Sequence, residues 1–218
     1  MSTFSLLVCD DSSMARKQLL RALPAAWPVT ISQACHGQEA LDLLRTQHFD
    51  LLLLDLTMPV LDGYGVLAAI RAEGLQCPVI VVSGDVQDEA MRRVTELGAL
   101  AFRRKPAEPA LLEETLQRLG FLDIAGVAQA QTEITEPKVT FRDAFREVIN
   151  VAMGRAAALL ARVLGVFVQL PVPNVNILEV GELHMALMDA QQGDRLTAVC
   201  QGHIGGGIWG DAILPSHA

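Results

Sequence analysis

Short apolar runs and helix-periodic stretches alternate along the first 120 residues. The apolar runs have the length of buried parallel strands and lie at Phe4–Cys9, Val29–Ala34, Leu51–Leu54, Val79–Val82 and, more weakly, Leu100–Phe102. Stretches with apolar positions at helical spacing separate them, at Ser13–Leu23, Gly37–Thr46, Tyr64–Glu73, Asp88–Leu97 and Pro109–Leu119. This alternation predicts an α/β fold, in which helices cover both faces of a five-stranded, doubly wound parallel sheet. Such sheets bind ligands beyond the carboxyl ends of their strands.

The pattern changes after residue 122. The segment from Gln129 to Pro137 is polar and ends in a proline, so residues 123–138 are interpreted as a linker between a first domain (1–122) and a second domain (139–218). A long helix is predicted at Phe141–Leu164. Three β-like runs follow, at Val175–Val180, Leu196–Gly202 and Ile208–Leu214, and the last two are punctuated by glycines, as in a hairpin or bulged pair. The second domain is therefore expected to be α+β.

Composition and charge narrow the class of protein. With 51% hydrophobic residues and a mean hydropathy of +0.33, the chain is no disordered polyelectrolyte. The net charge is −8, and acidic residues exceed basic ones both before and after Leu122. Nucleic-acid binding, and with it a transcription factor, is disfavoured because no basic field is present to hold a phosphate backbone.

Neither a membrane segment nor a cysteine motif is found in the sequence. The apolar stretch from Ala156 to Leu170 contains Arg162 and is shorter than the roughly 20 residues of a membrane span. The N-terminus lacks the pattern of a signal peptide. The four cysteines form no C-x-x-C pair, which argues against a zinc or redox motif and fits a reducing compartment. We expect a cytoplasmic protein that does not bind membranes.

Polar residues stand where the predicted strands end. Asp10 and Asp11 follow the first strand, Asp55 the third and Ser83 the fourth, and the fifth runs into Lys105. Three carboxylates at one sheet edge repel one another unless a hard cation such as Mg²⁺ neutralises them. A nucleophilic carboxylate, a metal, a lysine and a hydroxyl are what phosphoryl transfer needs. Taken singly, an aspartate could be a helix N-cap and the lysine a solvated charge, but the four strand ends together favour a site.

These positions resemble the receiver domain of two-component response regulators, the CheY-like family. The resemblance covers residues 1–122 and is carried by Asp10-Asp11, Asp55-Leu-Thr-Met-Pro59, Asp62-Gly63, Ser83 and Lys105-Pro106. It implies that a CheA-like histidine kinase phosphorylates Asp55. It further implies that Mg²⁺ is held by Asp10, Asp11, Asp55 and the carbonyl of Thr57. Ser83 and Lys105 would contact the phosphoryl group, and Phe102 would be the switch aromatic. Thr57 and Asp85 would tune the rate of self-hydrolysis.

The predicted long helix carries two unlike faces. At 100° per residue, Asp143, Glu147, Asn150 and Gly154 lie within about 60° of arc. The opposite side, which we expect to pack inward, carries Phe145, Val148, Ile149 and Ala152. The polar face could be merely solvated, with Thr140 and Asp143 forming a capping box. A gap at Gly154 could instead let a partner's backbone approach closely.

The spacing Asp143-x-x-x-Glu147-x-x-Asn150, followed after twenty-two residues by Pro173, resembles the signature of the CheC/CheX phosphatases. These enzymes act on phosphorylated CheY-like receivers. The resemblance implies that Asn150 orients a hydrolytic water and that Glu147 reaches the lysine of the substrate receiver, with Asp143 and Pro173 in support. Chemotaxis signalling is the setting that it implies.

Only one copy of this helix occurs, whereas CheC-type domains have two pseudo-symmetric halves. The second domain is therefore interpreted as partial, and we expect two chains to pair through it as a homodimer with two-fold symmetry. The preferred function is a response regulator with an aspartyl-phosphate phosphatase output. The alternative is a non-catalytic adaptor that docks on a receiver under control of Asp55 phosphorylation.

Overall fold

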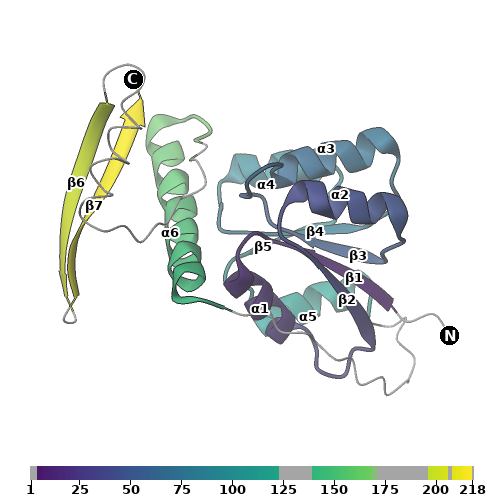
Figure 1. Cartoon of the computed structure of the whole chain (residues 1–218). Helices are drawn as coiled ribbons and strands as arrows, with labels where there is room; N and C mark the ends of the chain where they lie inside the picture. The colour runs from purple at the N-terminus through teal and green to yellow at the C-terminus, as the bar shows by residue number, and fades with distance from the viewer. Residues whose placement is uncertain (1–3, 123–138, 169, 171–195, 206–207, 218) are drawn as a thin grey trace. The chain divides into compact units, whose positions relative to one another are not determined.

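The protein is described by a computed structural model, which defines residues 4–122, 139–168, 170, 196–205 and 208–217 (Figure 1). The first part contains a parallel sheet of order β2-β1-β3-β4-β5. The strands are β1 (Phe4–Cys9), β2 (Val29–Ala34), β3 (Leu51–Leu54), β4 (Val79–Ser83) and β5 (Ala101–Arg104). The helices between and after them are α1 (Ser13–Ala22), α2 (Gly37–Thr46), α3 (Gly63–Glu73), α4 (Asp88–Glu96) and α5 (Pro109–Arg118). The predicted doubly wound α/β sheet is confirmed.

The core consists of two apolar layers, one on each face of the sheet. The four leucines of β3 are fully buried and alternate between the layers: Leu52 and Leu54 pack with α2, α3 and α4, whereas Leu51 and Leu53 pack with α1 and α5. The same distribution of helices over the two faces is visible in Figure 1. A strand buried on both sides has no polar face, which is why the central strands read as unbroken apolar runs.

The fifth strand extends further than its apolar residues indicate. Its pairing with β4 runs from Ile80 opposite Ala101 to Ser83 opposite Arg104. Arg103 and Arg104 therefore belong to β5. Charged residues are tolerated there because β5 is an edge strand, which can remain partly exposed to solvent. Backbone pairing with β4 therefore brings β5 to the residue before Lys105.

The long helix α6 spans Phe141–Leu164, as predicted. A capping box between Thr140 and Asp143 begins it, and Gly165 in the left-handed conformation (φ 69°) ends it. The prediction that its apolar side packs inward is wrong: Phe145 and Val148 are 48% and 65% exposed, whereas Glu147 is only 4% exposed. The polar side of α6 is buried instead because it contacts charged groups at the edge of the sheet.

The remaining strands form a two-stranded antiparallel sheet of β6 (Leu196–Gly205) and β7 (Ile208–His217), so the last two predicted β-like runs pair with each other. The chain divides into two compact units, residues 1–175 and 176–218, and α6 belongs to the first. The predicted strand at Val175–Val180, the linker at 123–138 and Pro173 lie outside the described residues. Within the described residues, no helix is long and apolar enough to cross a membrane.

Candidate phosphoryl-acceptor site

Three carboxylates meet at the carboxyl edge of the sheet. Asp10 and Asp11 follow β1, Asp55 follows β3, and each offers a carboxylate oxygen within 4.8 Å of the others. Asp10 and Asp55 are almost completely buried, at 0% and 2% exposure. Asp55 Oδ1 accepts no hydrogen bond from the residues that the structure describes. A buried, oxygen-only donor set with an unsatisfied acceptor fits a hard divalent cation such as Mg²⁺.

The turn after Asp55 is shaped by Asp62 and Gly63. The Asp62 carboxylate caps α3 by accepting a hydrogen bond from Gly65 N at 2.7 Å. A Cβ at Gly63 would lie 2.3 Å from the carbonyl oxygen of Asp55. Because only glycine allows α3 to start this close to the end of β3, this dipeptide helps position Asp55 and the following Thr57.

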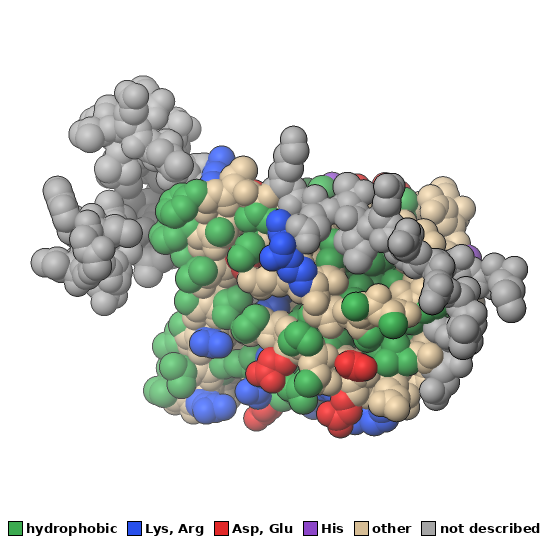
Figure 2. Space-filling model, turned by 90° about the horizontal axis from the view of Figure 1, so that it is seen from below, with side chains coloured by type: hydrophobic (Ala, Val, Ile, Leu, Met, Phe, Trp, Pro, Cys, Tyr) green, Lys and Arg blue, Asp and Glu red, His purple; other side chains and the backbone are tan. Residues whose placement is uncertain are grey.

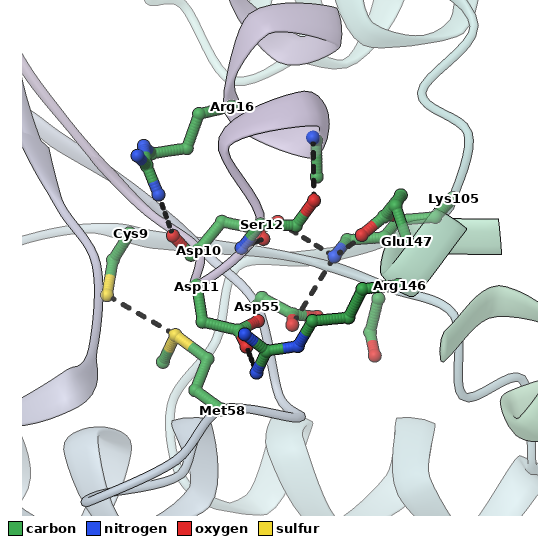
Figure 3. Close-up of polar contacts among 12 residues, drawn as sticks. Cys9, Asp10, Asp11, Ser12, Arg16, Asp55, Met58, Lys105, Arg146 and Glu147 are labelled. Atoms are coloured by element: carbon green, nitrogen blue, oxygen red, sulfur yellow. Dashed lines mark hydrogen bonds and ion pairs between the residues drawn. The ribbon is translucent and has the colours of Figure 1, made fainter. Parts of the chain in front are cut away.

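Lys105 is the buried cation of the site (Figure 3). Its Nζ lies 2.8 Å from Asp10 Oδ2 and 3.3 Å from Asp55 Oδ2. Its backbone N–H donates to the Ser83 carbonyl at 2.9 Å, which joins the ends of β4 and β5. Ser83 is fully buried at the end of β4. The sheet thus brings Asp10, Asp55 and Lys105 into direct contact and Ser83 to the same edge.

Burial and mutual repulsion perturb the acids of this site. Burial raises the pKa of Asp55 well above its usual value, although Lys105 opposes the shift. Burial, followed by the charge of Asp10, raises the pKa of Asp11 to about 6. Burial alone would lower the pKa of Lys105, but Asp10, Asp55 and Glu147 hold it above its ordinary value. The lysine therefore remains charged, and a bound cation would oppose the raised pKa values of Asp55 and Asp11 by favouring their ionised forms.

Helix α6 contributes two charged side chains to the same site (Figure 3). Glu147 Oε1 lies 3.6 Å from Lys105 Nζ, and Arg146 forms an ion pair with Asp11. Burial raises the pKa of Glu147, which Lys105 partly offsets. The polar face of the helix is therefore neither solvated nor free, because it closes over the carboxylates of the sheet edge.

Two turns after Glu147, α6 approaches the backbone of the segment that follows β4. A Cβ at Gly154 would lie 2.3 Å from the Gly84 carbonyl oxygen, and one at Gly84 would lie 3.2 Å from Val151 Cα. Beside this crossing is a pocket of about 440 Å³ whose lining includes Asn150, Thr57 and Asp85. Asn150 therefore faces a space at the edge of the candidate site that could hold water.

Three of the predicted site residues are not brought to the carboxylates: two lie at other places in the fold, and one lies outside the described residues. Asp143 closes the capping box of α6, Phe102 is half-buried and lines another pocket together with Lys105, and Pro173 is not described. The sequence reasoning missed Arg146 and Gly84 as participants. Arg146 lies on the polar side of the helical wheel, about 60° from Asp143, so its position carried a signal. Gly84 follows Ser83 directly and carried none.

The fold and the site define a receiver-type α/β domain with an acidic pocket and a buried lysine. The profile of the response regulator receiver domain family matches residues 6–117, just over half of the chain. The chain belongs to this family.

Individual proteins and a solved structure are also similar to this chain. A probable transcriptional regulator, ycf27, from Cyanidium caldarium is 38% identical over 52% of this chain and 45% of its own. A protein-glutamate methylesterase/protein-glutamine glutaminase from Halalkalibacterium halodurans is 29% identical over 100% of this chain and 65% of its own. The CheX–CheY–BeF3–Mg complex from Borrelia burgdorferi contains a chain with 27% identity and a TM-score of 0.50, covering 54% of this chain and 89% of that one. The chain thus spans about half to two thirds of the length of these two curated relatives.

Proposed function

We propose that the protein is a chemotaxis-type response regulator whose α6 face hydrolyses aspartyl phosphate. A CheA-like histidine kinase phosphorylates Asp55, and the CheC-like helix removes the phosphoryl group from a CheY-type receiver. The observation that carries the proposal is the ion pair between Glu147 of α6 and Lys105 of a receiver pocket. It is the contact that the resemblance to CheC and CheX implies between a phosphatase helix and its substrate.

The residues of the pocket divide the work of accepting the phosphoryl group. Asp55 supplies the nucleophilic oxygen, Lys105 pairs with the added phosphoryl charge, and the Ser83 hydroxyl donates to a phosphoryl oxygen. The chemistry that Mg²⁺ supplies, when held by Asp10, Asp11, Asp55 and the Thr57 carbonyl, is neutralisation of charge on the phosphoryl oxygens. Phe102, half-buried beside the pocket of Lys105, is the side chain proposed to respond to phosphorylation.

Hydrolysis needs an oriented water more than it needs a base. The Asn150 amide can both donate to and accept from a water molecule, which fixes the direction of attack. A loose phosphoryl-transfer transition state requires little base catalysis, so an amide suffices. Glu147 keeps the helix in register through Lys105. The structure from Borrelia burgdorferi, of which one chain is similar to about half of this one, contains CheX together with CheY, BeF3 and Mg, which supports the pairing of a CheX-type helix with a CheY-type receiver.

A non-catalytic adaptor is the second candidate function. The observation that favours it is that Glu147 and Arg146 pair with Lys105 and Asp11, contacts that hold α6 on the pocket without themselves requiring any chemistry. A transcriptional output is the function of the ycf27 relative by its name, but both parts of this chain are acidic, which opposes binding to a phosphate backbone. The proposed protein is cytoplasmic, binds neither membrane nor nucleic acid, and pairs through its second domain.

Release of inorganic phosphate tests the proposal. The full chain is phosphorylated with a small-molecule donor in Mg²⁺, and phosphate release is followed for the wild type and for Asn150→Ala. A rate that falls about 10- to 100-fold in the variant supports a phosphatase, because misplacing the attacking group costs about this much. Equal rates with retained docking support the adaptor instead. Methanol release from a methylated glutamyl substrate would support the activity named for the Halalkalibacterium halodurans relative.

A further inference from the structure

The receiver pocket that α6 occupies is that of its own chain. We propose that the substrate of the α6 face is the phosphoryl group on Asp55 of the same molecule, removed in cis, and that the docked helix also limits access to Asp55 before phosphorylation. This inference rests on the proposed function and specifies its substrate.

Two ion pairs hold the helix across the carboxylates. Glu147 contacts Lys105 on one side, and Arg146 contacts Asp11 on the other (Figure 3). Glu147 and Asp11 have side chains only 6% and 4% exposed in these pairs. Consecutive residues of one helix thus match a buried cation and a buried anion of one pocket. This match is a complementarity of charge rather than a chance surface contact.

A close backbone approach between α6 and the segment after β4 is made possible by glycine on both sides. A Cβ at Gly154 would lie 2.3 Å from the carbonyl oxygen of Gly84, which is a steric clash. A Cβ at Gly84 would lie 3.2 Å from Val151 Cα of α6. Any side chain at 154 would therefore push α6 away from the residue after Ser83. The sequence thus allows a close crossing between its own two segments.

The segment after α6 is held by the receiver as well. The Gln87 side chain donates to the Val168 carbonyl at 2.6 Å and accepts from the Val168 N–H at 3.0 Å. Helix α6 also packs against α1. The first domain therefore contacts both α6 and the segment that follows it.

Covalent connection favours the cis reaction over encounter with a second molecule. Residues 123–138 join the receiver to α6, so docking is intramolecular, with an effective concentration on the order of millimolar for a short connection. A separate receiver at micromolar concentration would compete poorly with a pocket already attached. The chain's own Asp55 is therefore the phosphoryl carrier that α6 meets first.

The reaction is a balanced hydrolysis. The oxygen of a water molecule held by Asn150 attacks phosphorus, the bond between phosphorus and the Asp55 carboxylate oxygen breaks, and the carboxylate leaves with the electron pair. The water protons pass to the phosphate product and to solvent. Because Asp55 is 2% exposed beneath the docked helix, a phosphodonor reaches it only after α6 moves away. After hydrolysis the helix lies again over the unphosphorylated Asp55.

Mixing two full-length variants separates cis from trans action. Asn150→Ala is phosphorylated and freed of donor, and its decay is followed alone and with an equimolar amount of unphosphorylated Asp55→Asn, which keeps the helix but cannot accept a phosphoryl group. Wild-type decay is measured at concentrations differing by a factor of about 100. We expect wild-type decay about 10- to 100-fold faster than Asn150→Ala, unchanged by dilution and not restored by Asp55→Asn.

Each other result has its own meaning. Acceleration of Asn150→Ala decay by Asp55→Asn, with wild-type decay that slows on dilution, overturns cis action and leaves the phosphatase function standing. Equal decay of wild type and Asn150→Ala overturns the phosphatase function itself. Circular dichroism of each variant confirms that the fold is retained. Glu147→Gln, which preserves side-chain shape, serves as a second variant and should slow the decay in the same direction.

A steric variant tests the docking separately from the chemistry. Gly154→Leu should undock α6, slow self-dephosphorylation and make Asp55 react faster with a small phosphodonor. Ala152→Leu adds the same side chain on the exposed side of the helix and is the matched control. Faster phosphorylation of Gly154→Leu alone supports the gate, whereas equal phosphorylation rates in both variants and in the wild type overturn it.

Discussion

The receiver sheet and helix α6 bury opposite kinds of side chain. Strand β3 buries four leucines and sends Asp55 to the edge, whereas α6 buries Glu147 and leaves Phe141, Val148 and Val163 at 77%, 65% and 83% exposure. In the sheet, apolar burial positions the polar groups. In α6, the polar groups themselves face the partner surface. Hydrophobic patterning therefore identifies the inner side of an element only when the surface it meets is apolar.

Exposed apolar side chains remain on the surface as a result. Figure 2 shows hydrophobic side chains among scattered charged ones on the face drawn. Among the described residues, those of α6 include Leu159, Leu160 and Leu164 besides the three above. An uncovered apolar face is consistent with the proposed pairing of two chains through the second domain, residues 139–218. Light scattering at micromolar concentration tests that pairing, and a folded monomer would contradict it.

The largest expected effect separates the phosphoacceptor from every other aspartate. Asp55→Asn should abolish the mass increase of about 80 Da that one phosphoryl group adds, because the nucleophilic oxygen is lost. Mass spectrometry after incubation with a small phosphodonor and Mg²⁺ measures it. Asp42→Asn, on the exposed side of α2, is the control and should be phosphorylated normally. Persistence of the added mass in Asp55→Asn would show that another residue accepts the group.

The second prediction compares the loss of stability caused by truncating an apolar side chain in β3 and in α6. Leu53→Ala removes a fully buried side chain from the layer between the sheet and helices α1 and α5, and should lower the free energy of unfolding by about 3 kcal/mol. Val148→Ala, on the exposed side of α6, should change it by no more than about 0.5 kcal/mol. Urea unfolding of both variants gives the two values. A large loss in Val148→Ala would mean that the exposed face of α6 is covered in solution.

The acidic edge should respond to pH in a defined direction. The pKa of Asp11 rises from 3.8 to about 6 on folding, so its contribution to stability is present below about pH 3.8 and is lost as pH rises through about 6. Without Mg²⁺, Asp11→Asn should therefore gain stability relative to the wild type as the pH increases from 4 to 7, by an amount on the order of 2 kcal/mol. Thermal unfolding in a chelator measures the difference, and a constant gap between the two proteins would exclude this role for Asp11.

The smallest effect concerns competition for Asp11. Arg146 pairs with this carboxylate, which is also a proposed ligand of Mg²⁺, so Arg146→Ala should raise the affinity for Mg²⁺ several-fold, about 1 kcal/mol. Calorimetric titration of the unphosphorylated protein provides the measurement. Arg162→Ala, exposed in the last turn of α6, is the matched control. Unchanged affinity in Arg146→Ala would mean that α6 docking and metal binding do not interfere.

Local sequence by itself determined the elements and the acidic edge. Strands such as Leu51–Leu54 are apolar on both faces, and α6 runs between its capping box and Gly165, so periodicity and end signals placed them where the structure has them. Topology then brings Asp10, Asp55 and Lys105 together, because parallel strands end at one edge. Chain direction and strand order were sufficient for this part of the prediction.

Only the tertiary structure decided which surface α6 meets. A helical wheel separates the polar side from the apolar side but does not say which of them is covered, and it gives no weight to Gly84, which lies far from α6 in the sequence. The pairing of Arg146 with Asp11 and of Glu147 with Lys105 joins residues that are distant along the chain. Such contacts depend on where two elements come to lie in space, and a periodic pattern within either element carries no information about that placement.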